Sequence, residues 1–433
     1  MKNNEKPVII GFGPAGMFAA LELVERGIKP LIFERGRKLE ERSVDIQRFI
    51  KEKVLNEESN IQFGEGGAGS YSDGKLFSKP GRNSAEAQKA LDTFIRFGAP
   101  ENIRSIGKPH LGTDVLCKIV ANIRDHILEK GGEIHYSSKM TDIIILEKNA
   151  AGVVINGNKE YRSSCIYLAI GHSARDTFGV LNEKGVIMEQ KPISVGIRIE
   201  HPVEIANRFR YGEASGGKAD NYSFTHNKLK TGRGVATFCM CPGGEIVNAS
   251  SENGLLALNG MSYSGRTSAF SNSAIVVACK TDDFGSADPL AGIEFQREIE
   301  RKAFNAGGGN WKVPAQNLTD FLSGRISANL NENSCKTGTA SASMNLIFPN
   351  FVCVSLREAF NAWKLEYPLF VSEHGILLGA ETRTTCPLRI RRGENYEAEN
   401  LGNLYPIGEG SGYAGGIMSS AIDAIKAVER IMN

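Results

Sequence analysis

The sequence predicts an α/β protein in which the two ends of the chain form one domain and a second, α+β domain is inserted between them. Three observations lead to this fold class. Residues 7–34 have the pattern of a strand, a glycine-rich turn, a helix and a second strand. Residues 404–432 repeat the strand, the glycine-rich loop and the helix. Between residues 191 and 369, strand-like patches alternate with polar loops, and this change in composition marks an insertion.

The first unit has a glycine-rich turn directly after its strand, with Gly11, Gly13 and Gly16 at a fixed spacing. Gly11 permits the tight turn, Gly13 lets a pyrophosphate approach the backbone, and Gly16 lets the helix pack closely on the strand. Pro14 and Ala15 open the helix, whose free N–H groups and positive dipole end favour an anion. The turn therefore predicts a site for the phosphates of a dinucleotide.

An acidic residue, Glu34, ends the second strand about 20 residues after Gly13, the usual spacing for a ribose-binding carboxylate. A carboxylate at this place accepts the ribose hydroxyls of an adenosine and disfavours a 2′-phosphate, which argues against NADP at this site. The same glycine pattern recurs at residues 64–69 and 410–415, but only the first copy has strand, helix, second strand and acid in order. We interpret the first copy alone as a dinucleotide-binding fingerprint.

The C-terminal segment supplies a second helix N-terminus behind a glycine-rich loop. Gly408 and Glu409 follow a short strand, and the helix begins near Ile417, after Gly415 and Gly416. The apolar residues of this helix recur at helical spacing and form one stripe, which predicts a helix packed on the core. A cofactor with a pyrophosphate and a separate electron-poor ring can use both helix ends, and FAD has those parts.

These motifs resemble those of the glutathione-reductase-like FAD-binding oxidoreductases. Within that group the chain is similar to the bacterial FAD-dependent dehydrogenases, often labelled NAD(FAD)-utilizing dehydrogenases. Three stretches carry the narrower resemblance, namely Phe63–Leu76, Cys239–Gly244 and Glu381–Pro387. The resemblance spans almost the whole chain, and it brings no known reaction with it.

The resemblance implies an FAD-binding Rossmann-like domain of glutathione-reductase type, formed by residues 1–190 and 370–433, with a three-stranded crossover meander. Residues 191–369 are then an inserted α+β substrate domain. Strand-like segments with an Asn-Gly turn signal between residues 132 and 171 match the meander. The C-terminal motif of the group has an aspartate that binds the ribityl chain, and Glu409 replaces it here. In the same group an arginine one turn into the next helix often reaches a phosphate, as Arg42, after Glu34-Arg35-Gly36, would allow here.

When the binding positions of the group are carried over to the matching residues of this chain, they and the motifs predict a set of cofactor-binding residues. They are Gly11, Gly13, Pro14, Ala15, Gly16, Glu34, Arg35, Arg42, Gly66, Gly67, Ala68, Ser70, Met140, Ala169, Ile170, Gly171, Gly408, Glu409, Gly415, Gly416, Ile417 and Met418.

Catalytic residues are not identified by any motif, because flavin performs the redox chemistry and the protein supplies binding, orientation and charge. Asp73 and Lys75 are candidates for the flavin face, since they lie in the glycine-rich stretch. There Lys75 would stabilise negative charge on reduced flavin and Asp73 would relay a proton. The alternative is a surface turn with solvated charges.

Cys241 is a third flavin-face candidate, and Cys239 lies two residues before it. On a regular strand both would point to one face, with Cα atoms about 6.5–7 Å apart, at or beyond the limit for an unstrained disulfide. The alternative is a pair of buried structural thiols. Glu381 and Arg383 have the same spacing, and we favour a structural ion pair between them over contact with the substrate.

Composition narrows the class of partner. The chain has 51 basic and 49 acidic residues, a net charge of +2, which gives no reason to expect nucleic acid. No apolar run is long enough for a signal peptide or a transmembrane helix, so we expect no integral membrane association. The 8 cysteines are scattered and no histidine or cysteine spacing suggests a metal site, which favours a reduced, cytoplasmic protein.

The leading interpretation is an FAD-dependent oxidoreductase that acts on an unidentified small molecule through flavin N5. NAD(P)H would be a transient electron donor, because the chain has no second complete dinucleotide-binding unit; otherwise another external donor reduces the flavin. One alternative is the reduction of an unsaturated isoprenoid or lipid. Another is a non-redox flavin-binding or RNA-modifying protein, and the near-neutral charge disfavours the RNA version.

Overall fold

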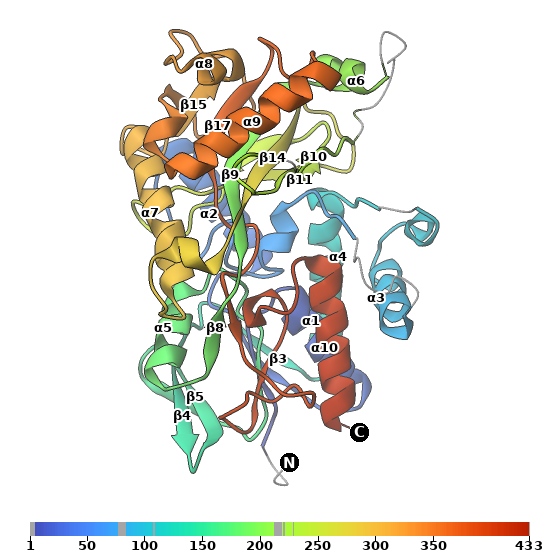
Figure 1. Ribbon diagram of the computed structural model, residues 1–433. Helices are drawn as coiled ribbons and strands as arrows, with labels where there is room; N and C mark the ends of the chain where they lie inside the picture. The colour runs from blue at the N-terminus through green and yellow to red at the C-terminus, as the bar shows by residue number, and fades with distance from the viewer. Residues whose placement is uncertain are drawn as a thin grey trace.

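Figure 1 shows the computed structural model, which describes residues 5–76, 84–106, 109–211, 219, 221–227 and 229–432. Two large sheets organise it. A five-stranded sheet forms the lower lobe, where both chain ends lie, and a seven-stranded sheet forms the upper lobe (Figure 1). Within the described residues, no helix has both the length and the apolar character needed to span a membrane.

The lower sheet is parallel throughout, with the strand order β19-β7-β1-β2-β3. Its strands are β1 (Val8–Ile10), β2 (Leu31–Phe33), β3 (Glu133–His135), β7 (Ile166–Leu168) and β19 (Leu404–Pro406). β19 pairs with β7, and β7 pairs with β1, so the first and last strand-turn-helix units share one sheet. The two ends of the chain thus contribute strands to the same sheet.

The N-terminal and C-terminal parts of the chain also form helices and short 3-10 turns. They are α1 (Pro14–Glu25), α2 (Leu39–Glu52), η1 (Ala68–Tyr71), α3 (Ala85–Arg96), η2 (Glu101–Arg104), α4 (Thr113–Glu129), α5 (Arg175–Glu183), η6 (Glu409–Ser411) and α10 (Ile417–Met432). Of these, α1 and α4 pack directly on the parallel sheet. α10 lies beside α1 (Figure 1), and apolar residues of both helices belong to one buried cluster. α1 is buried on nearly every side, since it is enclosed by the sheet, α10 and α4.

A separate three-stranded antiparallel sheet lies in the lower lobe, where the sequence predicts a meander. It consists of β4 (Met140–Leu146), β5 (Asn149–Ile155) and β6 (Lys159–Arg162). Asn156 and Gly157 connect β5 to β6 with φ of 51° and 78°. Asparagine and glycine tolerate this left-handed conformation, and for that reason the pair marks a tight hairpin in the sequence.

The upper sheet is mixed, with the order β10-β11-β14-β9-β17-β15-β16. Its strands are β9 (Ile193–Pro202), β10 (Thr225–His226), β11 (Val235–Cys241), β14 (Phe270–Cys279), β15 (Val313–Asn317), β16 (Thr339–Ser341) and β17 (Ile376–Glu381). The other elements of this lobe are α6 (Val203–Tyr211), β12 (Glu245–Asn248), β13 (Leu258–Met261), η4 (Thr281–Phe284), α7 (Ala291–Ala306), α8 (Leu318–Ser323), η5 (Met344–Leu346) and α9 (Asn350–Glu366).

The upper sheet extends past residue 369, where the sequence places the end of the insertion. β17 pairs with β9 on one side and β15 on the other, and every residue of β17 is buried. An apolar strand of this kind requires a partner on both edges, and the upper sheet supplies both. The chain crosses between the lobes at β8 (Met188–Gln190) and β18 (Leu388–Ile390), which pair with each other.

Candidate functional site

A cavity of about 400 Å³ lies between the two lobes. Its lower wall comes from the glycine-rich turn after β1, the stretch from Gly67 to Lys75, the end of β7 and the loop before α10. Its upper wall consists of Phe238, Cys239, Asn259, Glu381, Arg383 and Thr384. The glycine-rich segments from the two ends of the chain therefore open onto one space.

Most residues that the sequence predicts for cofactor binding line this cavity. They are Gly11, Gly13, Pro14, Ala15, Glu34, Arg35, Gly67, Ala68, Met140, Ala169, Ile170, Gly171, Glu409, Gly415, Gly416 and Ile417.

The lower wall is shaped to admit a ligand close to the backbone. At Gly171, Gly415 and Gly416 a Cβ atom would meet no atom within 4 Å, so each glycine leaves open space on the wall. Gly13, the N-cap of α1, makes no side-chain capping hydrogen bond, and Ala15 in the first turn lines the cavity. An uncapped helix N-terminus beside a glycine wall fits a phosphate-containing ligand.

Glu34 is held at the cavity by backbone amides. Its carboxylate accepts hydrogen bonds from the N–H groups of Phe12 at 2.8 Å, Gly36 at 2.9 Å and Gly64 at 3.0 Å. It thereby ties the turn after β1 to the glycine-rich stretch near residue 64. Each carboxylate oxygen has two lone pairs, so Oε2, which among the described residues accepts only from Phe12, keeps acceptor capacity, and Glu34 lines the cavity.

Arg42 does not line the cavity, contrary to the expectation that it reaches a phosphate. Its guanidinium is fully buried and donates to the carbonyl oxygens of Asn60, Ile61, Gly64, Glu65 and Gly67 at 2.7–3.4 Å. The backbone of residues 60–67 surrounds the guanidinium, so Arg42 stabilises the conformation of this loop from the side away from the cavity.

Arg35 does line the cavity, but its guanidinium already has partners. It pairs with Glu58 at 2.7 Å and with Asp176 at 2.9 Å, and it lies 3.9 Å from the centre of the Phe63 ring. These contacts fix the position of the Arg35 side chain beside the cavity.

Five further predicted residues lie behind the wall, where they pack the elements together. A Cβ at Gly16 would lie 2.0 Å from the carbonyl oxygen of Gly11, and one at Gly408 would lie 2.5 Å from Cβ of Ala15. A Cβ at Gly66 would meet Oγ of Ser70 at 2.0 Å. Gly66, Ser70 and Met418 are buried away from the cavity. These glycines allow two segments of the chain to pack closely against each other. The sequence pattern alone does not distinguish a glycine needed for such packing from a glycine that contacts a ligand.

Asp73 and Lys75 both line the cavity, and they form a charged cluster there. Lys75 Nζ lies 3.4 Å from the Asp73 carboxylate, which also contacts His110 and accepts a hydrogen bond from Ser262. Burial raises the pKa of Asp73, but the hydrogen bond from His110 and the charge of Lys75 outweigh it and hold the pKa at about 2. Asp73 is therefore ionised at neutral pH and is a poor proton relay.

Cys241 is fully buried and does not line the cavity, whereas Cys239 does. The reason is a break in β11: the register against β14 shifts between Phe238 and Cys241, and Cys239 has a φ of 44°. A bulge re-aims side chains that would share a face on a regular strand. The prediction that Cys241 faces the flavin is thus wrong, because its side chain is buried behind the cavity wall.

Glu381 and Arg383 do not pair with each other. Glu381 binds Arg198 through two hydrogen bonds of 2.7 and 3.0 Å, and Arg198 also donates to Asn272 at 2.7 Å. Burial raises the pKa of Glu381, and the charge of Arg198 opposes this shift. Strand alternation places the two side chains on one face, but the bulge between Gly379 and Glu381 and the turn after β17 send them to different partners.

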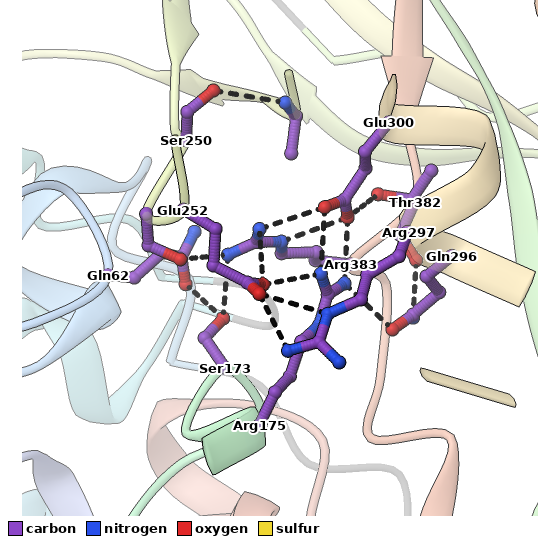
Figure 2. A network of polar contacts seen from close by, with 12 residues as sticks. Gln62, Ser173, Arg175, Ser250, Glu252, Gln296, Arg297, Glu300, Thr382 and Arg383 are labelled. Atoms are coloured by element: carbon purple, nitrogen blue, oxygen red, sulfur yellow. Dashed lines mark hydrogen bonds and ion pairs between the residues drawn. The ribbon is translucent and has the colours of Figure 1, made fainter. Parts of the chain in front are cut away.

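Arg383 belongs to a buried network that joins the lobes (Figure 2). Glu300 on α7 accepts two hydrogen bonds of 2.8 Å from Arg175 and bonds of 3.0 and 3.1 Å from Arg383. Thr382 Oγ1 donates to Glu300 at 2.6 Å, and Arg383 reaches Ser251 Oγ at 2.6 Å. Burial raises the pKa of Glu300, but the two arginines outweigh it and lower the pKa. No sequence motif marks Glu300.

Comparison with known proteins identifies the upper lobe. Residues 192–384 match a family model described as "FAD-dependent protein, C-terminal domain-like". A protein of Clostridium beijerinckii, described only as uncharacterised, is 43% identical over 432 residues, which are 99% of this chain and 80% of that protein. This chain and the Clostridium beijerinckii protein belong to one family, and residues 192–384 carry the FAD-dependent protein C-terminal domain.

Solved structures with low similarity include several flavoenzymes. CtdE in complex with FAD is 12% identical, with a TM-score of 0.39 over 99% of this chain and 85% of that one. A 2-methyl-3-hydroxypyridine-5-carboxylic acid oxygenase mutant is 10% identical, with a TM-score of 0.41 over 98% and 81%. A geranylgeranyl bacteriochlorophyll reductase-like protein of Thermoplasma acidophilum is 11% identical, with a TM-score of 0.40 over 98% and 77%.

The whole upper wall lies within the segment that matches the family model, since its residues run from Phe238 to Thr384. A second cavity of about 500 Å³ adjoins the first and shares Phe238, Thr384 and Gly415 with it. Its other lining residues include Ile193 and Val276 from the upper sheet. The matched domain thus supplies the main cavity with a side chamber.

Two titratable groups of the lower lobe complete the lining of the cavity. Burial raises the pKa of Glu409 to about 7, and the charge of Lys191 opposes the shift. Burial and the charges of Arg383 and Arg175 lower the pKa of His172 to about 3, so its imidazole is neutral at physiological pH. Both residues line the cavity, and Glu409 is the one that titrates near neutrality.

Proposed function

We propose that this chain binds one FAD in the cavity between the lobes and acts as an oxidoreductase on a small molecule. The observation that carries the proposal is that the glycine-rich turns from the two ends of the chain, together with Glu34, line a single cavity. In this proposal the lower lobe is the FAD-binding domain, of glutathione-reductase type, and the upper lobe is the substrate domain.

The residues on the wall fit the parts of FAD. Glu34 and Met140 would hold the adenosine, and the uncapped N-terminus of α1 the pyrophosphate. Glu409 would accept from the ribityl hydroxyls, and the open space at Gly415 and Gly416 would admit the flavin end. FAD, when bound, supplies the hydride and electron-transfer chemistry of the reaction.

The charges on the wall suit electron transfer into this site. Burial lowers the pKa of Lys75, but the nearby thiols Cys239 and Cys241 and the carboxylate of Asp73 raise it overall, so Lys75 remains a cation. A cation at this place stabilises negative charge that develops in the cavity. Asp73 keeps Lys75 in position, and Glu409, with a pKa of about 7, is the wall residue suited to exchange a proton with a bound molecule at neutral pH.

The side chamber favours a substrate with an apolar part. Most of its wall is apolar, and Phe238 stands where it meets the main cavity. This observation supports the reduction of an unsaturated isoprenoid or lipid as a second candidate reaction. In either case NAD(P)H or another external donor visits the cavity transiently.

The absorption spectrum of the purified protein tests flavin binding, and anaerobic addition of NADH, NADPH and dithionite tests redox activity. Gly416→Leu should abolish flavin retention, because its side chain would enter the open space on the wall. Gly179→Leu is the matched control, since Gly179 also has no atom within 4 Å of a Cβ but lies outside the cavity. Equal flavin content in the two folded variants would contradict the proposed site, and a flavin that even dithionite leaves oxidised would contradict the redox function.

A further inference from the structure

One of the eight cysteines differs from the others in its chemical environment. All eight are free thiols. Burial raises the pKa to about 11 or 12 for a group of six, namely Cys117, Cys165, Cys279, Cys335, Cys353 and Cys386. In contrast, a hydrogen bond with the Cys241 thiol and the charges of Lys75 and Arg198 lower the pKa of Cys239 well below its ordinary value.

Cys239 and Cys241 stay in contact at the bulge, although only Cys239 lines the cavity and Cys241 lies behind it. The bulge that ends the regular pairing of β11 spans both residues, and the φ of 44° at Cys239 is uncommon for a residue with a side chain. Sγ of Cys241 lies 3.3 Å from the carbonyl oxygen of Cys239. On a regular strand, the Cα atoms of alternate residues are too far apart for an unstrained disulfide. That distance does not apply at a bulge, so the sequence-based argument against a Cys239–Cys241 disulfide no longer holds.

Two cations flank the pair. Lys75 donates a hydrogen bond to the carbonyl oxygen of Met240, the residue between the two cysteines. Arg198 Nη1 lies 3.2 Å from the carbonyl oxygen of Cys239 and 4.0 Å from Sγ of Cys241. Asp73 and Glu381 face the same cluster and balance part of this charge. Cations beside a thiol favour the thiolate, which is the reactive form.

We propose that Cys239 and Cys241 form a redox-active dithiol on the upper wall of the cavity, with small disulfides and thiols as its reaction partners. The proposal rests on the proposed FAD function only for the source of electrons. Cys239 is the attacking group, because it lines the cavity, and Cys241 behind it is the resolving group.

The reaction is a pair of thiol–disulfide exchanges. The Cys239 thiolate attacks one sulfur of a small disulfide, which breaks the disulfide bond, joins one half to Cys239 and releases the other half as a thiolate that takes a proton. Cys241 then loses its proton and attacks Cys239, which forms the Cys239–Cys241 disulfide and releases the second thiol. Reduced FAD returns the pair to the dithiol by giving it two electrons, with two protons taken from the flavin and the solvent.

The first experiment uses the reduced protein freed of flavin, so that its result is independent of FAD. We expect glutathione disulfide at pH 7 to convert wild type to an internal Cys239–Cys241 disulfide, seen by peptide mass spectrometry. Cys241→Ser should retain glutathione on Cys239, and Cys239→Ser should form neither product. Cys117→Ser is the control, because Cys117 is also partly exposed but has a raised pKa, and it should behave as wild type.

Cys239 should react at least about tenfold faster than Cys117, since each unit by which a thiol pKa falls raises the thiolate fraction by up to ~10-fold. Lys75→Met should move the pH profile of this reaction upward, and Lys75→Arg should restore it. Equal rates at the two cysteines, or a glutathione adduct as persistent in wild type as in Cys241→Ser, would overturn the dithiol.

The second experiment counts electrons in the oxidised protein with FAD bound. Anaerobic dithionite titration should consume two electrons per flavin more in wild type than in Cys241→Ser, because the disulfide is a two-electron acceptor. Identical consumption would overturn the exchange between the pair and flavin. A protein that carries no flavin but still forms the internal disulfide would contradict the proposed function and leave the dithiol standing.

Discussion

The two walls of the cavity differ in the chemical groups that form them. On the lower wall, Gly171, Gly415 and Gly416 leave the backbone open to the cavity. On the upper wall, Glu381 and Arg383 are each held by a buried ion pair, Glu381 with Arg198 and Arg383 with Glu300. A backbone wall requires glycine at fixed places in the chain. A wall of ion pairs requires only that oppositely charged side chains come into contact, and these side chains can belong to segments that are far apart in the sequence.

This contrast has an energetic side. Backbone amides that bind a ligand are held by the helix and strand to which they belong, so removal of one side chain perturbs them little. A buried ion pair is stable only while both partners are present, because an unpaired buried charge is strongly unfavourable. We therefore expect the upper wall to be the more sensitive of the two to single substitutions.

The largest effect is expected for Glu300→Ala. This change leaves Arg175 and Arg383 buried without their shared carboxylate, and loss of one partner of a buried pair costs about 3–5 kcal/mol. Urea unfolding should show this loss in the free energy of unfolding. Glu298→Ala, on the exposed side of the same helix, should change it by less than ~1 kcal/mol. If both variants lost a similarly small part of the free energy of unfolding, the expectation that the upper wall is more sensitive to substitution would be wrong.

Glu34→Gln tests the carboxylate of the lower wall that backbone amides hold in place. Three backbone N–H groups donate to the Glu34 carboxylate, and the amide that replaces it turns a donor toward at least one of them. An unsatisfied buried donor costs about 1–3 kcal/mol, and we expect flavin retention to fall with the free energy of unfolding. Glu160→Gln, in the exposed strand β6, is the control. Unchanged retention would exclude Glu34 from the FAD site.

Gly16→Ala tests the close packing behind the lower wall. The new Cβ would lie 2.0 Å from the carbonyl oxygen of Gly11, and overpacking of this kind costs about 1–3 kcal/mol. Gly179→Ala, also in a helix but with open space around it, should instead stabilise the fold by roughly 0.4–1 kcal/mol. Thermal unfolding of both variants should give shifts of opposite sign, and shifts of the same sign would contradict this account.

The smallest effect is a pH dependence. The folded-state pKa of Glu409, about 7, lies above its ordinary value, so its contribution to stability is full below about pH 4 and is lost as pH rises through 7. Because Glu409 lines an open cavity, we expect a loss of about 1 kcal/mol between pH 5 and 8 in the flavin-free protein. Glu409→Gln should show a flatter dependence in urea unfolding at several pH values, and parallel curves would contradict the shift.

The difference between the walls also explains what the sequence could predict. The turn at Gly11, the hairpin at Asn156 and the helix after Gly416 depend on local spacing, and the structure has all three elements. Arg42 was assigned to a phosphate because nothing local indicates that a distant loop surrounds its guanidinium.

Contacts that depend on tertiary structure were beyond local reasoning. Glu300 meets its arginines only because α7 packs against the start of α5 and the end of β17. The bulge that separates Cys239 from Cys241 depends on the partner strand β14, so strand periodicity gave both residues the same face. The lower wall is thus largely predictable from sequence, and the upper wall is not.

The meeting of the chain's two ends has a consequence for the order of events in the cell. The first glycine-rich turn leaves the ribosome roughly 20–80 s before the loop at Gly408, at elongation rates of about 5–20 residues per second. Until that loop and α10 emerge, the parallel sheet lacks its edge strand β19 and α1 lacks the helix beside it. Loading of the cofactor is therefore a late step that follows synthesis, and a ribosome that stalls before the final segment releases a chain unable to retain it.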